Sequence, residues 1–160
     1  MHIRLLVFMR FVVFLPFLSF ASTKAVFAQD ILITQEEFLA EQSAFDPSKS
    51  ERRYASVPAT GAPRIELKFP DVDKPVTVPT RVEILFESQA PAEPDPASFK
   101  VRYGQKQRDV TDRILINATL SKEGFSAKSV WLPPGHHQLS ITLADSFGRR
   151  TIQVIKFVVQ

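Results

Sequence analysis

His136 and His137 are the residues of this sequence that most directly suggest chemistry, because imidazole nitrogens bind transition metals. They are the only histidines after residue 28 and follow Gly135 at the start of an alternating apolar segment. Neighbouring residues of a strand point to opposite faces of a sheet, so one ion would not easily bind both rings. We therefore treat them as candidate metal ligands, with a solvent-exposed start of a strand as the simpler interpretation.

Hydrolytic catalysis is the second kind of chemistry to consider. Ser140, His137 and Asp145 have the right residue types, but Ser140 and His137 are three apart on one predicted strand and face opposite ways. No nucleophile-elbow sequence is present. The carboxylates Glu83 and Glu87 share a strand face with a basic residue, which is typical of a solvated sheet surface. The sequence predicts no catalytic residue, no cofactor and no enzymatic activity.

A local cluster of basic residues lies in the middle of the chain. It consists of Lys100, Arg102, Lys106 and Arg108, on a predicted strand and the turn that follows it. These side chains could contact an acidic glycan, a lipid headgroup or the acidic patch of a partner protein. The alternative is that they keep a sheet face soluble and discourage edge pairing.

The first 28 residues have the pattern of a cleavable signal peptide. Arg4 and Arg10 give a positive leader, residues 11–21 form an uncharged and mostly apolar run, and small residues precede Ala28. A membrane-spanning helix needs roughly 20 predominantly apolar residues, and Arg10 interrupts the apolar stretch. We expect cleavage after Ala28, export to a periplasm or to the medium, and no integral membrane segment afterwards.

The composition of residues 29–160 excludes several classes of protein. The isoelectric point near 9.3 owes its excess of basic residues to the leader, because residues 29–160 hold 17 basic and 17 acidic side chains. This balance gives no support to nucleic-acid binding. Cysteine is absent, which excludes disulfides, thiolate catalysis and zinc–cysteine sites.

Residues 29–63 form an arm that begins with a helix signal. Thr34 and Glu37 have the spacing of a capping box, and the pattern predicts a short helix over residues 35–44, ended by Asp46 and the following proline. So short a helix is not stable alone in water. Its apolar side chains should therefore pack on the rest of the chain or on a partner.

Phe38, Leu39 and Phe45 are the candidate docking residues of this arm. Residues 46–63 are polar, charged and proline-bearing, which indicates a linker. Two arrangements stay open: the helix covers its own domain, or it binds another protein.

Residues 64–160 show short two-residue alternation separated by turn signals, which predicts an all-β sandwich of about seven strands. The proline-rich segment 89–97 is not expected to be strand interior. Spacing in the last strand predicts a bulge near Ile155. The expected strands are residues 64–69, 81–88, 99–103, 110–116, 118–125, 127–132, 137–143 and 150–159.

Residues 132–149 resemble the closing hairpin of bacterial immunoglobulin-like domains, and residues 63–160 as a whole are similar to such a domain or to a fibronectin type III domain. The matching positions are Leu132, Gly135, Leu139, Ile141, Leu143, Asp145 and Gly148. The chain departs from antibody domains because it has no cysteine pair, and its only tryptophan, Trp131, lies in a late strand. The resemblance implies a sandwich that acts as a spacer, a surface module or a binding platform.

These observations favour an exported, non-enzymatic immunoglobulin-like module with a binding or assembly role. Its expected partner is another exported or envelope protein, with a glycan as a further possibility. One alternative is a small periplasmic metal-handling protein similar to copper-resistance sandwich proteins. Another is a surface spacer, although the chain has no internal repeat.

Overall fold

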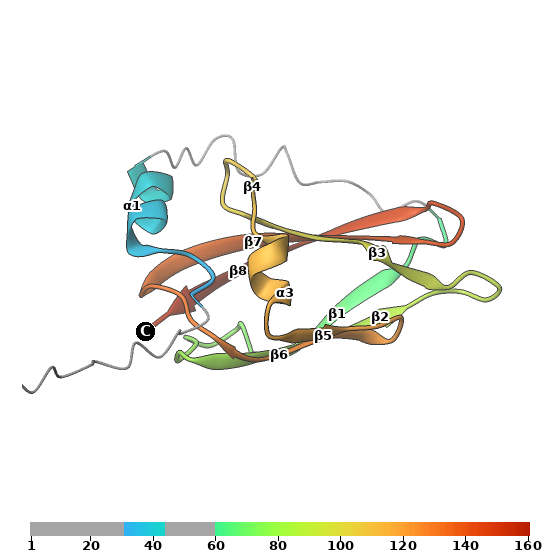
Figure 1. Ribbon diagram of the computed structural model, residues 1–160, viewed down its shortest axis with the longest axis horizontal. Coiled ribbons are helices and arrows are strands. Elements are labelled where there is room, and N and C mark those ends of the chain that lie inside the picture. The colour runs from blue at the N-terminus through green and yellow to red at the C-terminus, as the bar shows by residue number, and fades with distance from the viewer. Residues whose placement is uncertain (1–30, 44–59) are drawn as a thin grey trace, which may run out of the picture.

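The computed structural model describes residues 31–43 and 60–160, and these form two antiparallel sheets packed face to face (Figure 1). The fold is therefore an all-β sandwich, as the alternation predicts. The predicted signal peptide and most of the predicted linker lie outside the described residues. Within the described residues, no helix is long and apolar enough to cross a membrane.

Each sheet has four strands. The first sheet has the order β1-β2-β6-β5, with β1 (Arg64–Phe69), β2 (Thr80–Glu87), β6 (Gly124–Val130) and β5 (Ala118–Leu120). The second has the order β4-β3-β7-β8, with β4 (Arg108–Asp109), β3 (Pro94–Tyr103), β7 (Gly135–Asp145) and β8 (Arg150–Val159). In the described part of the chain, the helices α1 (Gln35–Ser43) and α3 (Thr111–Leu115) accompany the sheets.

The core lies between the sheets and is centred on aromatic rings. Phe99 of β3 stacks on Phe125 of β6 with 5.3 Å between ring centroids, and contacts Phe86 of β2 at 5.7 Å. Ile141 and Leu143 of β7 are buried in the same cluster. Strands from both sheets thus contribute to one apolar layer, which provides the stability that the absent disulfides do not.

The β7–β8 hairpin is the longest regular unit and pairs without interruption from Gly135↔Val159 to Ala144↔Arg150. The predicted bulge near Ile155 is therefore wrong. Thr151 points inward near the turn, and Ile155 lies four residues later on the same, buried face. Regular two-residue alternation therefore places Ile155 in the core without a bulge. Ile152 and Val154 are half-buried on the outer face.

The predicted strand over residues 110–116 is also wrong, because this segment contains helix α3. Asp109 Oδ1 accepts the N–H of Thr111, and the Thr111 side chain bonds to the backbone of Val101. Val110 and Ile114 are both buried and four apart, which is the spacing of a helix face. Local hydrogen bonds and this helical spacing outweigh the β-branched composition.

Two further boundaries differ from the expectation. β3 starts at Pro94, inside the segment 89–97, and its pairing with β7 shifts register between Asp95 and Lys100. Prolines are tolerated at such an irregularity, where no ladder donor is lost. The predicted strand 118–125 ends early, because residues 121–124 form the turn between β5 and β6.

The helix predicted in the arm forms as α1, and its capping box is confirmed. The Glu37 N–H donates to Thr34 Oγ1 at 3.2 Å, and the Thr34 N–H donates to Glu37 Oε2 at 3.1 Å. Phe38 is 8 % exposed and Leu39 is 56 % exposed, so the helix turns one apolar residue toward the sandwich and one away. Phe38 is therefore covered by its own domain, and Phe45 lies outside the described residues.

Phe38→Ala is expected to lower the free energy of unfolding by about 3 kcal/mol, because it removes a buried aromatic ring and leaves a cavity. Leu39→Ala, one residue further on the same helix, is the matched control and should change it by less than about 0.5 kcal/mol. Urea denaturation of both variants measures the difference. Equal effects would mean that α1 does not dock through Phe38.

Candidate functional site

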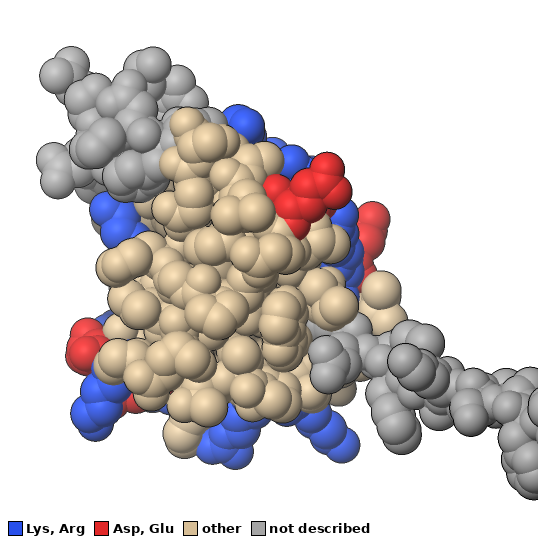
Figure 2. All heavy atoms as spheres, turned by 90° about the vertical axis from the view of Figure 1, so that its left-hand side faces the viewer, with Lys and Arg blue, Asp and Glu red and all other residues tan. Residues whose placement is uncertain are grey.

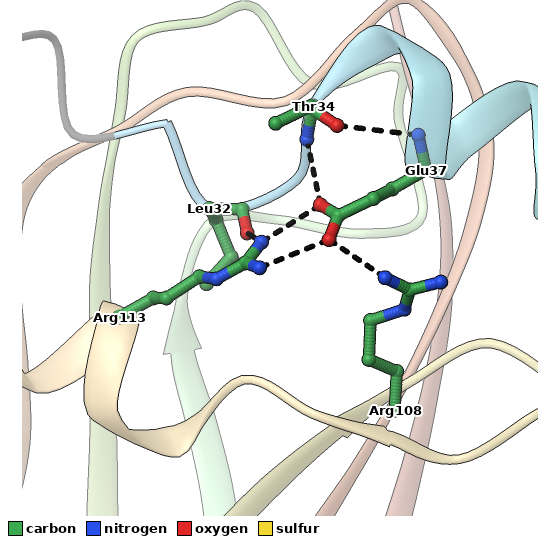
Figure 3. A network of polar contacts seen from close by, with 5 residues as sticks. All are labelled: Leu32, Thr34, Glu37, Arg108 and Arg113. Carbon is green, nitrogen blue, oxygen red and sulfur yellow. Dashed lines mark hydrogen bonds and ion pairs between the residues drawn. The ribbon is translucent and has the colours of Figure 1, made fainter.

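The carboxylate of Glu37 fastens α1 to the second sheet and to α3 (Figure 3). Arg113 binds it with two nitrogens, Nη1 at 2.7 Å from Oε2 and Nη2 at 2.9 Å from Oε1, and Arg108 Nη1 lies 2.8 Å from Oε1. Arg113 also donates to the Leu32 carbonyl at 3.3 Å. The carboxylate of Glu37 therefore serves both as part of the capping box and as the partner of Arg108 and Arg113.

These contacts change the acidity of Glu37. Its side chain is only 13 % exposed, so its ion pairs are poorly screened by water. The hydrogen bonds from Arg113, helped by the Thr34 N–H and the charge of Arg108 and opposed by burial, lower the pKa of Glu37 to about 2. Glu37 is therefore ionised throughout the physiological range.

The C-terminal half of α1 is fastened to the turn between β3 and β4. Glu41 Oε1 accepts the N–H groups of Gln105 and Lys106, and Lys106 Nζ donates to the Ala40 carbonyl at 3.3 Å. Gln42 Nε2 donates to the His136 carbonyl at 3.1 Å. The helix is thus held at both ends against the same sheet.

The predicted anion-binding cluster is divided by this helix. Lys106 and Arg108 are engaged with α1, whereas Lys100 and Arg102 are exposed on the outer face of β3. Their charges help to lower the pKa of Asp109, after the larger effect of its hydrogen bonds with Thr111. Two of the four residues thus have a structural role.

His137 is buried beneath α1, in an aromatic stack. Its ring centroid lies 5.0 Å from that of Phe38 and 5.6 Å from that of Phe157. Its Nε2 lies 2.7 Å from the Pro133 carbonyl, which can only accept, so Nε2 carries the proton. Nδ1 lies 3.1 Å from the Tyr103 hydroxyl and accepts from it. The ring is neutral, and both nitrogens have partners.

Burial shifts the pKa values of both His137 and Tyr103. Desolvation lowers the pKa of His137, and His136 adds a smaller effect in the same direction, while the bond to Pro133 opposes them. Burial also raises the pKa of the Tyr103 hydroxyl to about 12. Gly135 completes the contact, because a Cβ there would lie 2.5 Å from the Phe38 ring.

The two histidines point to opposite faces, as strand alternation predicts. His136 is exposed and His137 is buried with both nitrogens engaged, so the described residues do not present them together to one ion. No group of three His, Asp or Glu side chains within residues 31–43 and 60–160 could hold a metal. Ser140 is likewise turned to the face opposite His137, where its Oγ lies 3.3 Å from Gln107 Nε2.

A cleft of about 590 Å³ lies beside α1, and sequence reasoning did not find it. The end of the molecule that carries α1 shows mainly uncharged side chains, with Lys, Arg, Asp and Glu around its margin (Figure 2). The cleft is bounded by the end of α1, the β3–β4 turn, the loop before Val76, and the paired ends of β7 and β8. The lining residues are Glu41, Gln42, Val72, Asp73, Lys74, Pro75, Tyr103, Gly104, Gln105, His136, His137, Gln138, Lys156, Phe157 and Val158.

One wall of the cleft combines polar groups with an aliphatic surface. Gln138 pairs with Lys156 across the two strands, and His136 pairs with Val158 two residues further along. Lys156 forms no ion pair with another described residue, and Gln138 Nε2 is a buried donor without an acceptor in that part of the chain. The alternation of β7 and β8 places these side chains on one face. The sequence does not show that α1 borders them.

Comparisons with known proteins add little to these observations. No protein-family model matches the chain, and no curated protein matches it. Among solved structures it is similar to the crystal structure of CopC from Methylosinus trichosporium OB3b, with 14 % identity and a TM-score of 0.41. The alignment covers 61 % of this chain and 94 % of that chain.

Glu37→Gln is expected to lower the free energy of unfolding at pH 7 by about 2 kcal/mol, because it removes an anion shared by two arginines. The pKa of Glu37 is depressed in the folded protein, so its contribution is complete above its ordinary value of 4.5 and declines as the pH falls toward 2. Denaturant melts at several pH values measure this slope. Glu36→Gln, at the neighbouring and exposed position of the same turn, should keep the slope of the wild type.

His137 is expected to make stability depend on pH in a higher window. Because its pKa is lowered on folding, the unfolded chain binds the proton first and stability falls as the pH drops below about 6.5. Melting temperatures between pH 7.5 and 5 should show this decline in the wild type and in His136→Gln. His137→Gln should be less stable at pH 7.5 and should lack the decline; an unchanged slope would contradict the assignment.

Proposed function

We propose that residues 29–160 form an exported, non-enzymatic binding module on an immunoglobulin-like sandwich, and that the cleft beside α1 holds its ligand. The strand order supports the immunoglobulin-like assignment. Sheets β1-β2-β6-β5 and β4-β3-β7-β8 have the arrangement of the two sheets of an immunoglobulin constant domain, with β4 as an additional edge strand.

The observation that carries this proposal is the cleft itself. Its volume of about 590 Å³ lies within the usual range for small-molecule sites, which are mostly apolar with a few polar groups. Val72, Pro75 and Val158 provide the apolar surface, and Lys156 provides a positive charge. These features suit a small amphipathic anion, with its carboxylate at Lys156 and its aliphatic body against the loop before Val76.

The arrangement of the described polar residues supports binding rather than catalysis. Both ring nitrogens of the buried His137 are hydrogen-bonded, one to the Pro133 carbonyl and the other to the Tyr103 hydroxyl. No serine hydroxyl accepts from it or donates to it among the described residues. A general base needs a free nitrogen within reach of the proton that it removes. The metal-handling alternative is not favoured either, because His136 and His137 face opposite ways and no group of three His, Asp or Glu side chains among the described residues could hold a metal.

Octanoate is a suitable probe, with octanol as its uncharged counterpart. Calorimetric titration of the protein should show octanoate binding and weaker octanol binding. Lys156→Gln should weaken octanoate binding about tenfold, which corresponds to about 1.4 kcal/mol and to the loss of one charge-assisted contact. Lys100→Gln removes a lysine from the same sheet face, away from the cleft, and is the matched control.

Equal affinity of the two lysine variants would locate the anion outside the cleft, and failure of octanoate to bind would exclude this ligand class. Native mass spectrometry of protein purified from its own exported fraction provides an independent check. A retained small molecule in the wild type that is lost in Lys156→Gln agrees with the proposal. A retained protein partner in both would favour assembly through another surface.

A further inference from the structure

Strand β8 is an edge strand of its sheet, and the direction of its backbone groups follows from the hairpin. The Asp145 N–H donates to the Arg149 carbonyl at 3.0 Å, which closes the turn. Bonded pairs of an antiparallel ladder recur every second residue, so the odd-numbered residues of β8 bond to β7. The N–H and C=O groups of Ile152, Val154 and Lys156 therefore point away from the sheet.

The far end of this edge already accepts an extended segment. The Val76 N–H donates to the Val158 carbonyl at 2.7 Å, and the Gln160 N–H donates to the Val76 carbonyl at 3.0 Å. Val76 thus pairs in parallel with Val159. From Arg150 to Lys156, no strand among residues 31–43 and 60–160 continues this pairing.

A groove of about 650 Å³ runs beside the open part of the edge. Thr151 and Gln153 of β8 line one side, and Ile65 and Leu67 of β1 line the other. At one end of the groove the Thr151 hydroxyl donates to the Pro63 carbonyl, so the two sheet edges are joined there and the groove extends from that contact along β8. Side chains alternate along a strand, and every second side chain of a strand added to β8 would enter this groove. The site therefore offers backbone partners and room for side chains together.

The charge around the edge is positive. Arg150 and Lys156 are exposed at the two ends of the open stretch, and neither forms an ion pair with a described carboxylate. Between them, Ile152 and Val154 give a half-buried aliphatic surface. None of these four outward residues is aromatic, so this stretch lacks the flat ring on which a sugar would stack. An acidic polypeptide fits it better than a glycan.

We propose that the β8 edge from Arg150 to Lys156 pairs with an extended acidic segment of a partner protein, which adds a fifth strand to the sheet. Main-chain hydrogen bonds to Ile152, Val154 and Lys156 supply affinity, as in other complexes formed by strand addition. A segment of about seven residues spans the stretch, at about 3.3 Å per residue. This interaction shares Lys156 with the cleft but otherwise uses different residues, and its partner is a polypeptide rather than a small molecule.

A synthetic peptide that alternates glutamate and valine is a direct probe, and the same peptide with lysine in place of glutamate is its control. Hydrogen exchange of the full chain, followed by NMR, should show that the acidic peptide slows exchange at Ile152, Val154 and Lys156 about tenfold or more. The lysine peptide should not. The amide of Gln153 bonds to β7 and should change little.

Val154→Pro removes one edge donor without touching the bonds to β7, and should abolish peptide binding. Val154→Thr keeps the donor and is the matched control; Ile152→Pro is the second edge variant if Val154→Pro does not fold. Binding by the proline variants, no protection in the wild type, or protection of the three amides without peptide would overturn the proposal. Octanoate titration of Val154→Pro separates the sites, because cleft binding should persist.

Discussion

The ion pair between Glu37 and Arg113 is the contact on which the site depends. It joins the first turn of α1 to a helix 76 residues further along the chain, and the same carboxylate closes the capping box. A nine-residue helix is not stable alone in water, so this ion pair acts together with the burial of Phe38 and the contacts of Glu41 to hold α1 in place. Held in this way, α1 lies beside the ends of β7 and β8 and forms one wall of the cleft. The anion of Glu37, with these other contacts of α1, thereby turns the end of a sandwich into a bounded cleft.

The two faces of the β7–β8 hairpin have different roles, one in the core and one at the surface. Its odd-numbered residues bond across the hairpin and, with His137, Ile141 and Leu143, enter the core. Its even-numbered residues form the outer surface, and on β8 they also direct their backbone groups outward. One strand therefore supports the cleft with Lys156 and Val158 and offers an edge with Ile152 and Val154. Both proposed sites therefore follow from the two-residue alternation of β8.

Sequence reasoning recovered the sandwich and the capped helix, because alternation and the Thr34–Glu37 spacing are local signals. It failed at residues 110–116, where β-branched composition suggested a strand and side-chain bonds from Asp109 and Thr111 made a helix. The environment of His137 and the cleft could not be predicted, because both require Phe38 and Glu41 to meet residues far away along the chain. A buried histidine and an exposed histidine look identical when they are adjacent in sequence.

The contact between Gln42 and the His136 carbonyl joins residues 94 positions apart. A contact of such long range has an entropic cost, since the loop between its residues must close before it gives any stabilisation. During synthesis, α1 emerges long before the strands that it covers. The wall of the cleft therefore forms only when α1 and β7 are both in place, and a ligand that needs this wall would bind the completed domain alone.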